Sequence, residues 1–190
     1  VCEELDGKFN IMYAGNIGSA QGIDVILNAA AILGNRKKLQ FIVIGDGLEK
    51  PEIEAQAHKR GLETVRFLGK KTPEELSRYF AWADVLFLPL RKNPVYEVTI
   101  PSKTFTYLAC GRPILVAASG DVADLILEIG AGVVVPPENP EAIAAAILDL
   151  MKMDVRQREK LGEQALIAHQ KQFNRHELIR QYENLLRVEI

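Results

Sequence analysis

The chain has 190 residues, of which 48% are hydrophobic and 25% charged, and its formal net charge is −2. This composition is typical of a globular protein, and the near-neutral charge argues against nucleic-acid binding, which needs a concentrated basic surface. No apolar run reaches the roughly 18 residues of a membrane-spanning helix, and two cysteines make no disulfide framework, which fits a reducing, cytoplasmic compartment.

Strand-like and helix-like segments alternate from the N-terminus to about residue 154. Apolar runs predict strands at residues 9–15, 39–47, 65–69, 84–90, 113–119 and 132–137. Helical spacing predicts helices at residues 22–33, 51–61, 72–83, 102–110, 122–130 and 140–153, with Thr72 as the expected N-cap of the third helix and Pro73 in its first turn. Strands with near-continuous Val, Ile and Leu are buried on both faces. We therefore expect an α/β fold with a Rossmann-like, doubly wound, parallel six-stranded sheet, helices on both faces and a helical C-terminal tail.

The tail, residues 155–190, has no strand signals and carries one apolar stripe at helical spacing, made of Phe173, Leu178, Tyr182, Leu185 and Leu186. The stripe either packs on the sheet of its own domain or docks partly on a neighbouring domain. We expect residues 1–154 to form the sheet domain. Residues 155–190 should pack on it and on an N-terminal domain that this sequence does not include.

Four polar or glycine-rich segments follow predicted strands, at residues 15–22, 45–47, 68–71 and 91–103. Ligands of open α/β sheets bind beyond the carboxyl ends of the strands, so these segments should share one edge. Gly15 and Gly18 allow close approach of the backbone. Each segment taken alone is as consistent with a simple turn as with a ligand-binding loop. The evidence for a binding site is that the segments share one edge of the sheet.

The segment "IPSKTFTYLACG" predicts a short helix with an anion site at its start. Pro101 disfavours helix at Ile100, Ser102 can act as N-cap, and Gly111 can end the helix in a left-handed conformation. Unpaired amides in the first turn, the helix dipole and the adjacent Lys103 favour a phosphate. A plain capped helix without a ligand is the structural alternative.

Acids, bases and metal ligands are few. Glu97 and Asp46 stand at strand ends, where either could hydrogen-bond a polyhydroxyl ligand, although an isolated Glu97 is more often a solvated loop residue. The three histidines fall on charged helical segments and are interpreted as surface residues. No metal-ligand cluster or Ser-His-Asp arrangement is visible, so we expect no metal and no cofactor, with protein cations neutralising any phosphate leaving group.

In chain order, "YAGNIGSAQGIDVILNAAAIL", "FIVIGDG", "VRFLGKKTPEEL", "ADVLFLPL", "IPSKTFTYLACGRPIL" and "GVVVPPENPEAIAAAI" resemble the C-terminal, donor-binding half of retaining GT-B glycosyltransferases. The resemblance covers nearly the whole chain and is strongest to the bacterial branch that builds surface polysaccharides. It implies metal-independent transfer of a hexosyl group from a nucleotide-sugar, with UDP as the expected carrier, to a saccharide or lipid-linked acceptor.

The resemblance also implies roles for single residues. Lys103 and Glu97 would be catalytic, assisting departure of the diphosphate and contacting sugar hydroxyls. The donor would contact Gly15, Asn16, Gly18, Gly45, Asp46, Gly47, Leu68, Gly69, Lys70, Thr99, Ile100, Pro101, Ser102, Thr104 and Thr106. Two features depart from the family pattern: Thr106 stands where many relatives have a ribose-binding Glu, and Asn16 and Gln21 stand where many have Arg and Lys.

The implied partners are the nucleotide-sugar and an acceptor-binding N-terminal domain of the same chain, with no nucleic acid. The sequence begins with Val1 rather than Met, which fits a piece of a longer chain and a fragment that is inactive alone. The full enzyme would be cytoplasmic, with peripheral association at the inner face of the cell membrane. Two alternatives stay open: an NAD(P)-binding domain of an oxidoreductase, although Gly-x-Gly-x-x-Gly is absent, and a non-catalytic nucleotide-sugar-binding module.

Overall fold

The computed structural model describes residues 5–188, so the domain boundaries expected at residues 1 and 190 lie outside the described residues. Six parallel strands form one sheet: β1 (Phe9–Ala14), β2 (Leu39–Ile44), β3 (Val65–Gly69), β4 (Val85–Pro89), β5 (Ile114–Ala117) and β6 (Gly132–Val135). Their order across the sheet is β3-β2-β1-β4-β5-β6. All six predicted strands are confirmed, and so is the Rossmann-like doubly wound topology.

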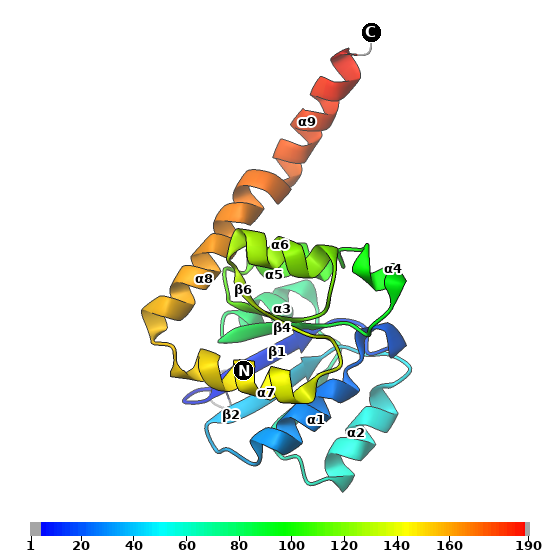
Figure 1. The fold of residues 1–190 in the computed structure, drawn as a ribbon, viewed down its shortest axis with the longest axis vertical. Helices are drawn as coiled ribbons and strands as arrows, with labels where there is room; N and C mark the ends of the chain where they lie inside the picture. The colour runs from blue at the N-terminus through cyan, green and yellow to red at the C-terminus, as the bar shows by residue number, and fades with distance from the viewer. Residues whose placement is uncertain (1–4, 189–190) are drawn as a thin grey trace.

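The helices of the sheet domain are α1 (Asp24–Leu33), α2 (Lys50–Lys59), α3 (Pro73–Phe80), α4 (Pro94–Glu97), α5 (Lys103–Ala109), α6 (Asp121–Ile129) and α7 (Pro140–Lys152), with a short 3-10 turn, η1, at Ser19–Gln21. Helices α1, α2 and α7 cover one face of the sheet, and α3, α5 and α6 cover the other (Figure 1). Alternate residues of β1 serve the two layers: Ile11 and Tyr13 pack on the first, Met12 on the second. This period of two explains why the strands read as unbroken apolar runs.

The ends of the predicted helices show one success, one error and one omission. Thr72 is the N-cap of α3, as predicted, and it forms a capping box with Glu75, which was not predicted. Ser102 was expected to cap α5 but lies in the helical region and makes no side-chain cap. No helix was predicted at residues 91–101, whereas α4 forms there because the side chain of Asn93 accepts a hydrogen bond from the amide of Val95.

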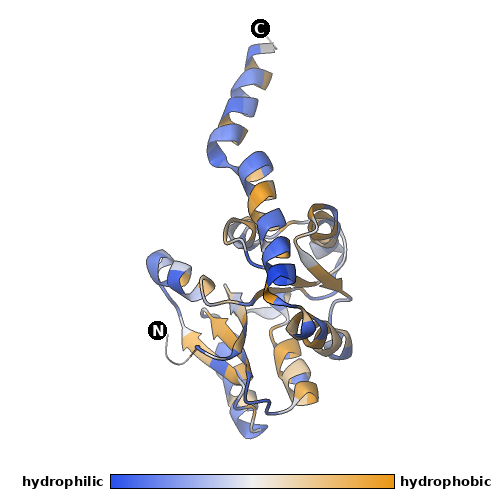
Figure 2. Cartoon of the chain, turned by 90° about the vertical axis from the view of Figure 1, so that its left-hand side faces the viewer, coloured by the Kyte–Doolittle hydropathy of each residue, from blue (hydrophilic) through white to orange (hydrophobic). Residues whose placement is uncertain are grey.

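The tail continues as α8 (Val155–Ala168), a π-helical turn η2 (His169–Phe173) and α9 (Arg175–Val188). Helix α8 lies on α5 and α6, whereas α9 projects away from the domain (Figure 1). Of the predicted stripe, Phe173 packs on Phe105 of α5, but Tyr182 is 69% exposed and its neighbours on α9 are also exposed. The stripe of α9 therefore does not cover the sheet, and Figure 2 shows this helix as mostly hydrophilic with apolar residues between.

None of the helices in the described part of the chain has an apolar stretch long enough to cross a bilayer.

The backbone of α8 packs closely against the turn that follows α5, where Gly162 faces Gly111. A Cβ atom built on Gly162 would lie 2.1 Å from the carbonyl oxygen of Gly111. Gly162→Ala should therefore lower the free energy of unfolding by about 1–3 kcal/mol, although alanine has the higher helix propensity by about 1 kcal/mol. Urea denaturation checks the change.

The matched control is Glu163→Ala, one residue along the same helix on an exposed position. It should stay within about 0.5 kcal/mol of the parent chain. A Gly162→Ala variant as stable as the control would contradict the close packing of α5 on α8.

Candidate functional site

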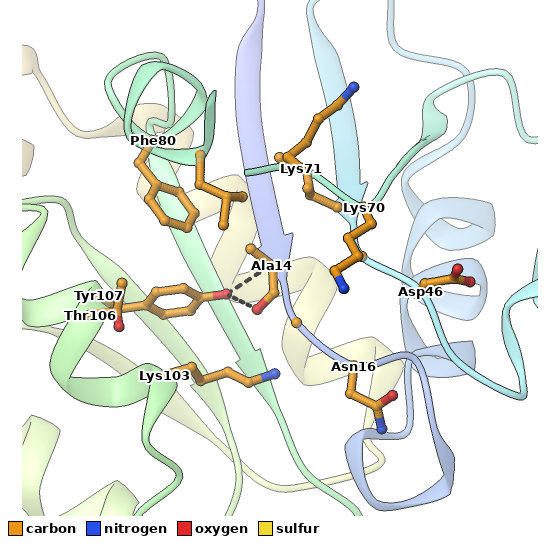
Figure 3. Close-up of a pocket in the computed structure, with 13 residues that line it drawn as sticks. Ala14, Asn16, Asp46, Lys70, Lys71, Phe80, Lys103, Thr106 and Tyr107 are labelled. Atoms are coloured by element: carbon orange, nitrogen blue, oxygen red, sulfur yellow. Dashed lines mark hydrogen bonds between the residues drawn. The ribbon is translucent and has the colours of Figure 1, made fainter. Parts of the chain in front are cut away.

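An open cavity of about 410 Å³ lies at the carboxyl edge of the sheet (Figure 3). Its walls come from the ends of β1 and β2, the segment after β3, and helices α3 and α5. They consist of Ala14, Gly15, Asn16, Ile44, Gly45, Asp46, Lys70, Lys71, Leu76, Phe80, Lys103, Thr106 and Tyr107. The cavity lies beside the point where the strand order reverses between β1 and β4, which is where open α/β sheets bind ligands.

Backbone hydrogen bonds hold the loops of this edge together beyond the last strand residues. The amide of Gly15 donates to the carbonyl of Ile44 at 2.9 Å, and the amide of Gly45 donates to that of Gly69 at 3.0 Å. The amide of Ile17 donates to the carbonyl of Asp46 at 2.8 Å. The loops after β1, β2 and β3 thus continue the parallel pairing of the strands as far as the rim of the cavity.

Helix α5 turns one face toward the cavity, because Lys103, Thr106 and Tyr107 are spaced i, i+3 and i+4. The hydroxyl of Tyr107 is fully buried and pairs with Ala14 on both sides (Figure 3). It accepts from the amide of Ala14 at 2.9 Å and donates to its carbonyl at 3.3 Å. This contact fixes α5 against the end of β1, and it lets Lys103 reach the loop that follows β1.

The ammonium group of Lys103 is held without an acidic partner. Its Nζ atom donates to the hydroxyl of Tyr13 at 2.7 Å and lies 4.1 Å from the centre of the Tyr13 ring. No ion pair involves Lys103 among the residues that the structure describes. Burial lowers the pKa of Lys103 to about 8, because the charged form loses water without gaining a counter-charge.

The cavity as a whole favours an anion. Lys70, Lys71 and Lys103 line it, and Asp46 is the one carboxylate among its lining residues. Within residues 5–188 these three lysines form no ion pair with a carboxylate, so their charge is available to a ligand. Phe80, Leu76 and Ile44 add apolar surface beside the charges. Cations next to an apolar wall suit a ligand that combines phosphate with a planar ring.

Arg91, at the end of β4, holds the loop after β1 from behind. Its guanidinium pairs with Asp24 at 2.8 Å and with Glu138 at 2.9 Å, and it also donates to the carbonyl of Ser19 at 3.2 Å. The amide of Lys92 and the Arg91 guanidinium keep the pKa of Glu138 below its usual value. This cluster connects three loops of the same edge and so supports the loop that contributes Gly15 and Asn16.

The structure gathers about half of the predicted site residues in the cavity: Gly15, Asn16, Gly45, Asp46, Lys70, Lys103 and Thr106. Gly47 lies in a shallower hollow next to it, together with Asn16 and Asp46. Leu68 packs in the core, and the carbonyl of Gly69 serves the backbone pairing at the rim. Gly18 begins the turn η1 and does not line the cavity.

The predicted residues from Glu97 to Thr104 lie outside the cavity lining, with the exception of Lys103. The carboxylate of Glu97 accepts a hydrogen bond from Ser119 Oγ at 3.1 Å, and the hydroxyl of Thr99 donates to carbonyls of α4. Ile100, Pro101 and Ser102 form the exposed or half-buried link to α5. The Thr104 side chain is fully buried, and its hydroxyl has no hydrogen-bond partner within residues 5–188.

The start of α5 offers fewer free amides than the sequence suggested. The amide of Thr104 donates to the carbonyl of Pro101 at 2.9 Å, and that of Phe105 donates to Ser102 at 3.2 Å. The amides of Ser102 and Lys103 have no hydrogen-bond acceptor within residues 5–188. The positive character of the site therefore comes mainly from the lysine side chains.

Sequence reasoning placed Lys71 at this edge of the sheet but not among the donor contacts, and it missed Phe80, Tyr107 and Tyr13. The spacing i, i+4 from Lys103 could have placed Tyr107 on the cavity face of the helix, and Lys71 directly follows a residue that was predicted. Phe80 and Tyr13 read as ordinary core residues, and no local signal separates them from the core. Their roles depend on contacts between elements distant in the chain.

Replacing Lys103 by methionine should make the domain more stable near neutral pH. The folded chain releases the lysine proton near pH 8 and the unfolded chain near pH 10.5, so burial of the charge costs stability below pH 8. We expect the free energy of unfolding of Lys103→Met to exceed that of the parent chain by about 1 kcal/mol or more at about pH 7. This difference should shrink toward about pH 10. Urea denaturation at both pH values measures it, and a pH-independent difference would contradict the unfavourable burial of the charge.

Comparisons with known proteins place this chain in a family. The family model of glycosyl transferases group 1 matches residues 8–153. A Pseudomonas aeruginosa protein named as a probable glycosyltransferase, WbjE, is 29% identical over 154 residues, which are 80% of this chain and 38% of that protein. An Escherichia coli (strain K12) protein provisionally named as a colanic acid biosynthesis glycosyl transferase, WcaI, is 31% identical over 145 residues, 75% of this chain and 35% of the relative.

A solved structure shares the fold over a similar range. Anabaena Alr3699/HepE in complex with UDP-glucose superimposes with a TM-score of 0.82 at 19% identity, over 97% of this chain and 50% of that one. The chain thus spans well under half the length of the two sequence relatives and half of the structural one. From the family match over most of its length, we conclude that the chain belongs to the glycosyl transferases of group 1.

Proposed function

We propose that this chain is the C-terminal, donor-binding half of a retaining GT-B glycosyltransferase, and that its cavity holds the diphosphate of a nucleotide-sugar. The observation that carries the proposal is the ammonium of Lys103, which lies in the cavity wall without an acidic partner in the described chain. Such a charge is unfavourable in the empty protein and becomes favourable when a phosphate enters. UDP is the proposed carrier, and the HepE structure, which is a complex with UDP-glucose, supports this choice.

The proposed donor extends across the edge of the sheet. Its base would lie toward the backbone of Phe67–Lys70, with the nucleoside beside Gly45–Gly47, and the diphosphate would meet Lys103 and the free amides of Ser102 and Lys103. Thr106 on α5 and Asn16 in the loop after β1 would make polar contacts to the donor that are weaker than that of Lys103. Glu97, with Thr99 to Pro101, would come close to the sugar from outside the cavity.

The proposed reaction breaks the bond between the anomeric carbon and the diphosphate oxygen, and the bonding electrons remain on that oxygen. An ammonium placed against the departing oxygen stabilises the charge as it develops, which lowers the barrier to transfer. With lysines supplying this charge, we propose that the transfer needs no metal ion. The acceptor hydroxyl oxygen would bond to the anomeric carbon from the side of the absent half, on the face that the diphosphate leaves, so the configuration of the sugar would be retained. Its proton would pass to the departing diphosphate oxygen.

The proposal for the whole enzyme follows from the length of the relatives. A preceding half would bind the acceptor, and the exposed apolar stripe of α9 would pack on that half. This fragment alone would bind the donor weakly and catalyse little. We further propose a hexosyl transfer to a saccharide or lipid-linked acceptor, in the cytoplasm at the inner face of the cell membrane. The name of WcaI, a colanic acid biosynthesis glycosyl transferase, supports a role in polysaccharide synthesis.

The oxidoreductase alternative is not favoured, because the family match is to glycosyl transferases and the glycine pattern of dinucleotide sites is absent. A non-catalytic nucleotide-sugar module stays as the second candidate. Thr106, Asn16 and Gln21 stand where charged residues are usual in the family, which favours that candidate. Turnover by the complete parent chain would distinguish the two.

Calorimetry with UDP, UDP-sugars, uridine and NADH tests the proposed donor site. UDP should bind and NADH should not. Lys103→Met should weaken UDP binding at least about tenfold and leave uridine within about twofold, because uridine carries no phosphate. Since the free ammonium is lost as the pH rises through about 8, the affinity of the unchanged chain for UDP should fall above that pH.

The matched control is Lys59→Met, which removes one exposed lysine from the far end of α2. This variant should bind UDP like the parent chain. If Lys103→Met binds UDP with unchanged affinity, or shows the same decline above pH 8, Lys103 has no role at the phosphate.

A further inference from the structure

Lys103 reaches the cavity on a side chain with four rotatable bonds, so its ammonium needs a second contact to stay in one place. Of the groups that line the cavity with it, Lys70 and Lys71 repel it, while Asp46 forms no ion pair with it in the described chain. The hydroxyl of Tyr107 is occupied by Ala14. The one hydrogen bond that the described residues give to the Lys103 ammonium is to Tyr13.

Tyr13 is suited to hold a cation in place. Its ring is fully buried at the end of β1, and its hydroxyl donates to the carbonyl of Asn16 at 2.5 Å. With its proton committed to that carbonyl, the hydroxyl oxygen presents its lone pairs to Lys103 at 2.7 Å. The same ring contacts the ammonium through its face, 4.1 Å from the centre. Burial raises the pKa of Tyr13, which keeps the hydroxyl protonated at neutral pH.

Gly15 closes the opposite side of this arrangement. A Cβ atom on Gly15 would lie 2.5 Å from Nζ of Lys103 and 3.1 Å from the hydroxyl oxygen of Tyr13. The ammonium therefore sits directly against the backbone of the loop after β1, in a space that a larger residue would fill. Tyr13, Asn16 and Gly15 all belong to this loop or to the strand before it, so one segment defines the position of the charge.

We propose that Tyr13 is a positioning residue for Lys103: its hydroxyl, oriented by the carbonyl of Asn16, holds the ammonium inside the cavity and joins helix α5 to the loop after β1. The benefit to ligand binding rests on the proposed function, since it requires a diphosphate in the cavity. The effect of Tyr13 on the lysine itself does not. The two can therefore be measured separately.

The test is Tyr13→Phe, which keeps the ring and removes only the hydroxyl. The pKa of Lys103 is followed by NMR of ¹³C-labelled lysine side chains, with the Lys103→Met variant used to assign the signal. Loss of an acceptor disfavours the charged form, so the pKa of Lys103 should fall further in Tyr13→Phe. UDP affinity should fall about fivefold or more, while uridine binding should not change.

A double-mutant cycle separates positioning from a general structural effect. In the Lys103→Met background, Tyr13→Phe should no longer change the affinity for UDP. Thr64→Val is the control for loss of a buried hydroxyl: Thr64 lies just before β3, does not line the cavity, and its replacement should not move the pKa of Lys103. If Tyr13→Phe does not fold, 3-fluorotyrosine at position 13 keeps the hydroxyl but weakens its oxygen as an acceptor, and the same fall in pKa is expected.

The outcomes are distinct. An unchanged pKa of Lys103 in the Tyr13 variants overturns the positioning role, whether or not UDP binds. An equal loss of UDP affinity with and without Lys103 also overturns it. If the parent chain does not bind UDP, the proposed function fails, and the shift in the pKa of Lys103 alone then decides the role of Tyr13.

Discussion

The site depends on one unfavourable interaction, the burial of an ammonium group without a carboxylate to neutralise it. A surface lysine would be solvated, and a buried lysine is normally paired. Lys103 is half-buried and has no acidic partner among the described residues, and its pKa is lowered to about 8 as a result. What keeps it in place is the packing of α5, through Tyr107 on Ala14, and the contact with Tyr13. The desolvation of this positive charge lowers the stability of the protein, and an anionic ligand would offset that loss.

The fold explains why this charge lies where it does. The strand order reverses between β1 and β4, so the loops after these strands separate and leave a crevice at the carboxyl edge. Helix α5 follows β4 and returns across that crevice, which brings Lys103 against the loop after β1, some 90 residues away in sequence. Backbone pairing beyond the strand ends, and the Arg91 cluster behind the loop, make the edge rigid. Contacts that connect these loops suit the proposed chemistry, which relies on charges already in position.

Much of the fold could be predicted because its signals are local. Apolar runs such as "FIVI" and "VLFLP" indicate that a strand is buried on both faces, and Thr72 followed by Pro73 indicates where α3 begins. The site was harder. Lys103 was predicted from its place before a short helix, but Tyr13 has the same local pattern as Ile11, and only the tertiary contact with Lys103 separates them. Ser102 failed as an N-cap because a turn through Pro101 and Ser102 already bonds the amides of Thr104 and Phe105. The short α4 was missed because four residues give no periodicity.

The helix that carries Lys103 is also the anchor of the C-terminal arm. Helix α5 has seven residues and meets the tail through Phe105 on Phe173 in the π-helical turn, and the turn that follows α5 meets α8 where Gly111 faces Gly162. Both contacts lie before α9 leaves the domain. Helix α8 also contacts the sheet region directly, because Arg158 lies beside Asp84 and over the ring of Phe9. A displacement of the projecting arm would therefore reach both α5 and the sheet. The C-terminal arm and Lys103 are therefore connected through the same short helix.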